Sequence, residues 1–373
     1  MVEATSEIRA TRNGSRFARA AIAGVARRAE PIVIASGALI AGLLLFSLFL
    51  LALGKSPTQF FELMWRGGFG SWFSTQNMLT RAAPLLLAGL CVALPARLGL
   101  IVIGGEGAIV LGGLAAAAIG TALEPAPAPI VIAAMALCAM LAGGVWIGAI
   151  GALRHYRAVN ETISGLLMGY IAIALMNHLV EGPLRDPASL NKPSTTPLAE
   201  AVRIGPIPGT DVHWGLVVGV VACFIAWALI EKTTWGFSAR IAGGNLRAAQ
   251  IQGLPVGALI TGFCALAGAF AGLGGMIEVA AVQGSANASL AAGYGYTGVL
   301  VAFLARQNPL AMIPIAMLLG GVAAAGGLIQ RRMDLPDATT LVLQGTIFLV
   351  ILFSETLYGR FDIFHPERWT KEQ

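Results

Sequence analysis

The sequence predicts an all-α integral membrane protein, and three properties of the chain lead to this fold class. Of the 373 residues, 57% are hydrophobic and 12% are charged, and the mean hydropathy is +0.77; soluble domains carry about 25% charged residues. Apolar runs of about the 20 residues needed to cross a bilayer recur along the whole chain. The polar stretches between them are short. We therefore expect about ten transmembrane helices within residues 31–358.

The apolar runs define the expected spans to within several residues at each end. Pro84 and Pro95 in the second run, and Gly104, Gly105 and Gly107 at the start of the third, predict a kinked or broken backbone between these two spans. The ten runs lie near residues 32–53, 80–98, 100–121, 128–151, 161–180, 214–230, 255–277, 288–305, 309–328 and 338–357.

Basic residues set the expected orientation in the membrane. Six arginines precede the first run, which indicates a cytoplasmic segment (residues 1–30) beside anionic lipid rather than a nucleic-acid site. The first run is longer than the 7–15 residues of a signal-peptide core, so we expect it to be retained. With both termini in the cytoplasm, including the tail 359–373, sixteen of the 24 Lys and Arg residues lie inside, as the positive-inside rule requires.

Two connections are long enough to have structure of their own. The first, residues 181–213, contains six prolines, which predicts an ordered but irregular extracytoplasmic cap. The second, residues 231–254, is expected in the cytoplasm, with Asn245 capping a short helix at 246–252 and Gly253 ending it. Such a helix is a docking element, and the residues it offers to a partner are Arg247, Ala248 and Ala249.

Small residues and motifs exclude several alternatives. The spacing of Gly144 with Gly148, and of Gly268 with Gly272, predicts close helix packing. A GKS triplet ending at Ser56 lacks the first glycine of a phosphate loop, and GYGYTG (293–298) has no strand before it. We expect no nucleotide or metal in this chain, and a transport subunit rather than an enzyme.

Polar side chains within the apolar runs are candidates for a substrate pathway. Glu106 and Glu278 each cost roughly 2.5 kcal/mol or more if they are ionised in lipid. Glu106 is interpreted either as part of the pathway or a gate, or as a contact between helices. Glu278 is expected near the outer interface. Tyr294 and Tyr296 are either an aromatic belt at that interface or a substrate contact.

Four more polar residues complete the predicted set. Gln283 and Asn287 precede the tyrosines and are potential hydrogen-bond partners of a substrate. Asn160 and Glu161 begin the fifth span, where they fit either ordinary placement of charge at a helix end or a cytoplasmic gate.

The segment TTWGFSARIAGGNLRAAQIQGLPV (233–256) resembles permeases of ribose-type and nucleoside-type ABC importers. The resemblance continues through VNETISGLLMGYIA (159–172), GAFAGLGGMIEV (268–279) and GYGYTGVLVAFLARQNPL (293–310), so it covers most of the chain after about residue 75. The GYGYTG and VNE segments are similar to the branch paired with basic-membrane-lipoprotein-type binding proteins. In VIGGEGA, Val102 and Ala108 stand where this family has amides.

This resemblance implies a type II ABC importer permease in the cytoplasmic membrane of a bacterium. It implies a second, different permease chain, an extracytoplasmic binding protein, and a cytoplasmic ATPase that holds ATP and Mg²⁺. The implied cargo is a nucleoside or a related purine or pyrimidine compound, with a simple sugar as the alternative. An ion-coupled secondary transporter is a further alternative, but the second half of the sequence has no copy of the Glu106 region, as internal repeats require.

Overall fold

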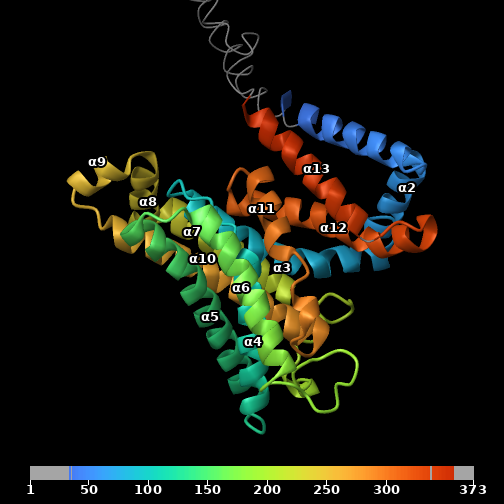
Figure 1. Ribbon diagram of the computed structural model, residues 1–373, viewed down its shortest axis with the longest axis horizontal. Helices are drawn as coiled ribbons and strands as arrows, with labels where there is room; N and C mark the ends of the chain where they lie inside the picture. The colour runs from blue at the N-terminus through green and yellow to red at the C-terminus, as the bar shows by residue number, and fades with distance from the viewer. Residues whose placement is uncertain (1–32, 35, 337, 357–373) are drawn as a thin grey trace, which may run out of the picture. The chain divides into compact units, whose positions relative to one another are not determined.

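The computed structural model describes residues 33–34, 36–336 and 338–356, and these ranges are almost entirely helical (Figure 1). The segments 1–30 and 359–373, expected in the cytoplasm, lie outside the described residues. The helices are α2 (Pro57–Gly68), α3 (Trp72–Ala96), α4 (Gly105–Ala122), α5 (Ala128–Arg157), α6 (Glu161–Glu181), α7 (Gly215–Lys232), α8 (Thr234–Gly244), α9 (Leu246–Ile251), α10 (Val256–Ile277), α11 (Tyr294–Leu304), α12 (Pro309–Met333) and α13 (Ala338–Glu355). A π-helix, Glu278–Gln283, extends α10, and 3-10 turns lie at Glu200–Val202 and Ala288–Leu290.

The described helices confirm an all-α membrane fold. Seven are long and apolar enough to cross a bilayer, namely α3, α4, α5, α6, α7, α10 with its π-helical extension, and α12. The helix Ser36–Ala52 and α2 form a bent pair that makes an eighth if it is one span. Ala288–Leu304 and α13 are shorter apolar segments. The expected number of about ten is reached only when these two shorter segments are included.

The chain divides into two compact units, of which the first joins Met1–Phe60 with Leu335–Gln373. In its described part the helix Ser36–Ala52 packs on α13. A Cβ atom on Gly42 would lie 3.2 Å from the Cα atom of Ile347, so the two backbones are close. This pair follows the general rule that small residues allow apolar helices to approach in lipid.

The second unit, Phe61–Asp334, is organised around α10. Here α5 and α10 lie side by side (Figure 1) and meet glycine to glycine, since Gly143 contacts both Gly268 and Gly272. A Cβ atom on Gly272 would overlap the carbonyl oxygen of Ala139. The close packing expected from the glycine spacing is therefore confirmed.

The expected break between the second and third spans lies after α3, not within it. α3 begins at Trp72, eight residues before the predicted start, where the Ser71 side chain accepts a hydrogen bond from the Ser74 backbone N–H at 3.1 Å. The helix then continues through both of its prolines to Ala96. Residues 97–104 are not α-helical, and α4 begins only at Gly105.

The connection 181–213 is ordered and irregular, as predicted. Its backbone is tied to the segment after α10: the N–H groups of Thr195, Leu198 and Ile204 donate to the carbonyl oxygens of Ala286, Gly284 and Ala280 at 2.9, 2.8 and 2.9 Å. The loop therefore covers one end of α10. Its location outside the cell stays a prediction.

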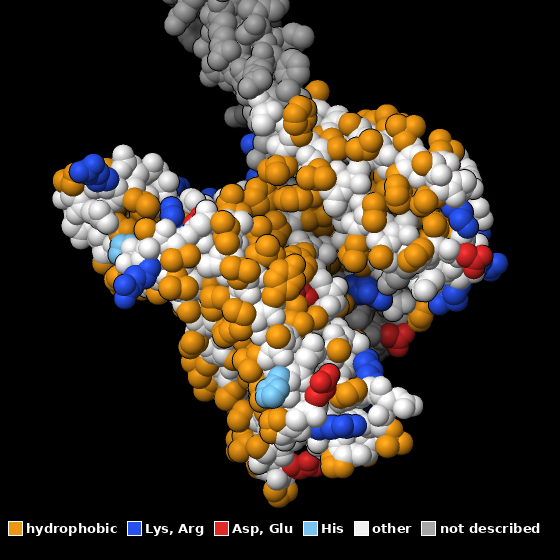
Figure 2. Space-filling view, viewed as in Figure 1, with side chains coloured by type: hydrophobic (Ala, Val, Ile, Leu, Met, Phe, Trp, Pro, Cys, Tyr) orange, Lys and Arg blue, Asp and Glu red, His pale blue; other side chains and the backbone are white. Residues whose placement is uncertain are grey.

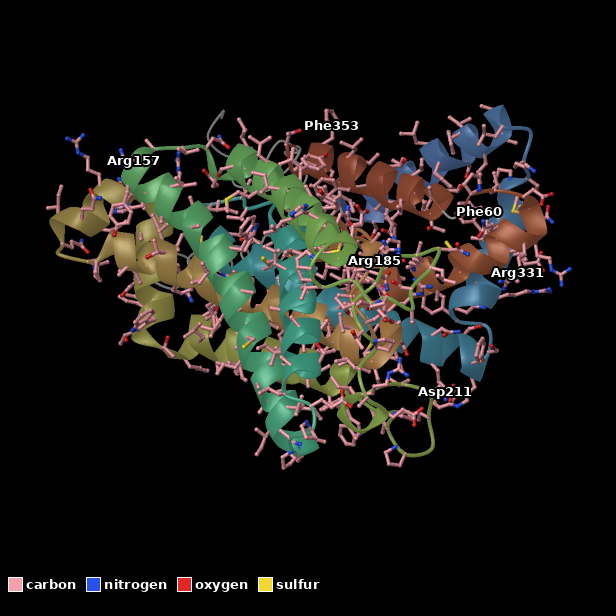
Figure 3. All side chains as sticks on the ribbon, turned by 60° about the horizontal axis from the view of Figure 1, so that its bottom comes forward. Phe60, Arg157, Arg185, Asp211, Arg331 and Phe353 are labelled. Carbon is pink, nitrogen blue, oxygen red and sulfur yellow. The ribbon has the colours of Figure 1, made fainter. Side chains whose placement is uncertain are left out.

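The other end of the unit carries α8 and α9, which extend beside the C-terminal end of α5 (Figure 1). Figure 3 shows Arg157 at this end, whereas Asp211 lies in the 181–213 loop at the opposite end. Between the two ends, hydrophobic side chains cover the face over α5 and α6 (Figure 2). An apolar band between two charged ends is the surface that a bilayer requires.

Candidate functional site

The N-terminal ends of two helices meet inside the second unit, and we call this meeting of α4 and α11 the junction. α4 follows the non-helical residues 100–104, and α11 contains only 11 residues. A Cβ atom on Gly295 would overlap the backbone nitrogen of Glu106, so no side chain fits between the two helix starts. Irregular backbone of this kind is tolerated at membrane depth only where protein or a water-filled cavity surrounds it.

Glu106 holds the junction together. Its Oε1 atom accepts a hydrogen bond from the Gly293 N–H at 2.7 Å, and its Oε2 atom accepts one from the Gly295 N–H at 2.6 Å. These donors belong to the start of α11, where the helix dipole favours negative charge. The side chain is only 2% exposed. This is the helix contact that was one of the two interpretations of Glu106, and its role in the pathway stays a prediction.

The two predicted tyrosines lie in the first turn of α11. The expected span 288–305 is not one continuous helix, because a turn with Gly293 at φ 84° separates Ala288–Leu290 from α11. Beyond the other end of α11, the Gln307 carbonyl accepts a hydrogen bond from Arg97, just after α3, at 3.1 Å. Eleven residues rise about 16 Å, roughly half of the 30 Å hydrocarbon core. The position of Tyr294 and Tyr296 at the outer interface stays a prediction.

Charged and polar side chains surround Tyr294. The guanidinium of Arg81, on α3, lies beside the Tyr294 hydroxyl and attracts the Glu278 carboxylate. Glu278 is 5% exposed, and its Oε1 atom accepts a hydrogen bond from Gln283 Nε2 at 3.3 Å. Glu278 begins the π-helix at the end of α10, two residues before Ala280, whose carbonyl oxygen binds the 181–213 loop. Its expected place near the outer interface stays a prediction.

Three other predicted residues act locally at helix ends. Asn287 caps the turn that follows it, accepting a hydrogen bond from the Ser289 N–H at 2.9 Å. Asn160 caps α6 and accepts from the N–H groups of residues 162 and 163, both at 3.0 Å. Glu161 forms an ion pair with Arg154 at 3.2 Å. For the last two, the geometry is that of ordinary helix-end charge, and a gating role stays a prediction.

The short helix α9 forms as predicted. Asn245 accepts a hydrogen bond from the Ala248 N–H at 3.0 Å, and Gly253 ends the turn with φ 80°. Ala249, however, is fully buried against its own chain, so the expectation that it faces a partner is wrong. Arg247 is exposed, and so is Ile251, at 82%.

α8 connects this helix to the end of α3. A Cβ atom on Gly243 would overlap the carbonyl oxygen of Arg97, so the two backbones touch. Arg240 pairs with Glu231 at 2.9 Å, and Arg97 approaches the same carboxylate at 4.0 Å. Arg97 also binds the carbonyl of Gln307, so contacts connect α8 through Arg97 to the end of α11.

Residues 74–352 match the family described as branched-chain amino acid transport system / permease component. The chain belongs to this permease family. The permease is 31% identical to the glucose ABC transporter permease protein TsgB13 of Haloferax volcanii over 88% of this chain and 90% of that protein. It is 30% identical to the guanosine ABC transporter permease protein NupP of Bacillus subtilis, over 89% of this chain and 95% of that protein. It is 23% identical to the nucleoside ABC transporter permease protein NupB of Lactococcus lactis subsp. cremoris, over 84% of this chain and 88% of that protein.

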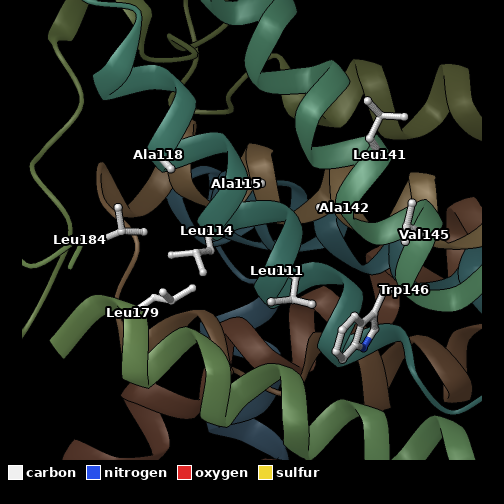
Figure 4. A pocket seen from close by; sticks show the side chains of 10 residues that line it. All are labelled: Leu111, Leu114, Ala115, Ala118, Leu141, Ala142, Val145, Trp146, Leu179 and Leu184. Atoms are coloured by element: carbon white, nitrogen blue, oxygen red, sulfur yellow. The ribbon is translucent and has the colours of Figure 1, made fainter. Parts of the chain in front are cut away.

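An apolar groove of about 530 Å³ lies between α4, α5 and α6 of the permease (Figure 4). Leu111, Leu141 and Leu179 are among its lining side chains, and Trp146 closes one end. Because the groove opens on the apolar face of the permease and has almost no polar lining, it suits a lipid chain. The polar junction, not this groove, is the candidate pathway.

Sequence reasoning missed two residues of the permease. Arg81 counts among the basic residues expected outside, at the start of the span expected from residue 80, although Phe73, Asn77 and Arg81 are spaced at four residues, as on one helix face. Ile251 was not singled out, because an apolar residue in a polar loop is weak evidence without a structure.

Proposed function

We propose that the permease forms the translocation pathway of an ATP-driven importer and receives its energy through α8 and α9. The observation that carries this proposal is α9 itself: a helix capped at both ends, exposing Arg247 and Ile251, at the end of the unit where Gly243 touches Arg97. An exposed apolar side chain beside a basic one is suited to a groove on another protein. The partner would be a cytoplasmic ATPase that holds ATP and Mg²⁺.

The proposed cargo is a nucleoside. The relatives named for guanosine and for nucleosides support this cargo, and the relative named for glucose supports the simple-sugar alternative. Tyr296, 39% exposed beside the junction, provides an aromatic face on which a base can stack. A binding protein outside the membrane and a second permease chain would complete the importer. Both termini of the permease would lie in the cytoplasm, and the complex would reside in the cytoplasmic membrane.

Ile251→Asp tests the coupling. The side chain is 82% exposed, so the substitution should leave folding unchanged, while a charge at the centre of an apolar contact weakens ATPase binding on the order of tenfold or more. The measurement is copurification of the ATPase with detergent-solubilised permease, together with substrate-stimulated ATP hydrolysis. Leu190→Asp is the matched control, because Leu190 is also 82% exposed but lies in the 181–213 loop. Equal ATPase recovery from both variants would contradict the proposal.

Competition for uptake tests the cargo. Cells carrying the complete importer should take up labelled guanosine, with strong competition from other nucleosides and little from ribose. Competition by glucose or ribose without competition by nucleosides would favour the simple-sugar alternative.

A further inference from the structure

Three interruptions of regular helix converge on one set of side chains. α4 begins late at Gly105, α11 begins late at Tyr294, and α10 changes into a π-helix at Glu278. Each interruption weakens the backbone hydrogen-bond pattern, and π-turns are frequent at functional sites. The polar side chains beside them are Arg81, Glu278, Gln283 and Tyr294, which we call the polar cluster.

Arg81 faces this cluster from an exposed row on α3. Phe73, Asn77 and Arg81 are all exposed and follow one another at four-residue spacing. Arg81 is the tenth residue of α3, about 13 Å from the start of that helix. Charged side chains at such depth usually face a bundle interior or a water-filled cavity. A guanidinium that only reached for the outer interface would turn away from Tyr294, whereas Arg81 lies beside it.

The two carboxylates near Tyr294 differ in how much hydrogen-bond acceptor capacity is still free. Both oxygens of Glu106 are occupied by backbone N–H groups at 2.7 and 2.6 Å. Glu278 receives one long hydrogen bond on Oε1, from Gln283 at 3.3 Å, and no donor within the described ranges reaches its Oε2 atom. Arg81 attracts Glu278, yet these two described residues do not close into an ion pair. Hydrogen-bonding capacity therefore remains on both side chains.

A sugar hydroxyl suits this pair of side chains, because it is both a donor and an acceptor. One hydroxyl can donate to Glu278 and accept from Arg81, and the adjacent hydroxyl can bond to Gln283 or Tyr294. The cluster has a cation and a carboxylate, and Glu106 lies nearby, so a phosphate would meet net repulsion. A neutral ligand with vicinal hydroxyls is the class that this chemistry selects.

We propose that Arg81 and Glu278, with Gln283 and Tyr294, bind the hydroxyl groups of the cargo's sugar ring as it crosses the membrane. Glucose and guanosine, the cargoes in the names of two relatives, share such a ring and differ in the rest of the molecule. The inference rests on the proposed transport function, and it names the part of the substrate that this permease recognises. Hydrogen bonds here replace those that the sugar loses on leaving water, which lowers the barrier to passage.

The experiment uses the complete importer in proteoliposomes, with binding protein saturated by either guanosine or 2′,3′-dideoxyguanosine. Saturation makes the maximal uptake rate depend on the membrane complex and not on selection by the binding protein. The wild-type complex should move guanosine on the order of tenfold faster than the dideoxy compound. Glu278→Gln should lower the guanosine rate to about the dideoxy rate and leave the dideoxy rate within roughly twofold of wild type.

Arg81→Gln, at an exposed position, is the second variant. It should reduce the ratio of the guanosine uptake rate to the dideoxyguanosine uptake rate. Glu62→Gln is the matched control, because this glutamate is exposed and pairs only with Arg66 on the surface of α2. Copurification of all subunits verifies assembly of each variant. Equal loss of both rates in an assembled Arg81→Gln or Glu278→Gln complex, or no wild-type preference for guanosine, overturns the inference.

The outcomes separate this inference from the function on which it rests. If the wild-type complex transports glucose but not guanosine, the nucleoside proposal fails, and glucose and its deoxy forms then test the cluster by the same ratio. If the substrate moves without ATP hydrolysis, the importer proposal fails as a whole.

Discussion

The α5–α10 pair and the junction of α4 with α11 both bring backbones into contact through glycine, but they are stabilised differently. α5 and α10 are continuous helices, and Gly143, Gly268 and Gly272 meet without any polar side chain between them. At the junction, two helix starts meet, and the N–H groups of Gly293 and Gly295 would have no acceptor without Glu106. Close packing alone is sufficient where all backbone groups bond within their own helix. At the junction the helix starts leave backbone N–H groups unpaired, and the Glu106 carboxylate accepts their hydrogen bonds.

The largest expected effect comes from breaking the continuous pair. Gly272→Ala places a methyl group on the carbonyl oxygen of Ala139, and neither backbone can yield, so the free energy of unfolding should fall on the order of 2 to 3 kcal/mol. Gly262→Ala, on the same helix, is the control, because its Cβ atom would meet only the Trp235 ring at 3.6 Å. Thermal unfolding of the purified permease measures the difference. Similar melting temperatures would show that the pair is not closely packed.

Substitutions of Glu106 test how the junction of α4 with α11 is stabilised. Glu106→Gln leaves one oxygen for two N–H groups, and one buried donor without a partner costs about 1 to 3 kcal/mol. Glu106→Ala removes both acceptors and should be more harmful. Transport should decline in the order wild type, Gln, Ala, while each variant still inserts into the membrane. If Glu106→Ala transported at the wild-type rate, the carboxylate would not be what holds the two helix starts together.

The smallest expected effect is a pH dependence of stability, and it comes from His213, between the α5–α10 pair and the junction. His213 and Ile277, where α10 becomes a π-helix, both lie against Gly215. Burial lowers the pKa of His213 from its ordinary value of 6.5, and the Thr80 backbone nearby opposes this only in part. The folded state favours neutral histidine, so this contribution to stability is present above pH 6.5 and is lost as the pH falls through the lowered pKa.

The melting temperature should therefore decrease between pH 7.5 and pH 5, and His213→Phe should reduce that decrease. Phe has a similar shape and no titrating group in this range. An unchanged pH dependence in the variant would assign the loss to other groups.

Much of this permease followed from its sequence. Apolar runs of bilayer length determine the spanning helices because lipid leaves the backbone no other hydrogen-bond partners, and local rules were enough for the glycine contacts and for the caps of α9. These features depend on residues that are near one another in sequence or repeat at helical spacing.

Only the tertiary structure decided the junction of α4 with α11. The apolar run 288–305 has the composition of a span, yet it is divided because Glu106, nearly 190 residues away in the chain, binds the start of α11. The same contact places Tyr294 beside Arg81 and Glu278. Hydropathy measures how a segment partitions into lipid, and it contains no information about which distant side chain compensates a broken backbone.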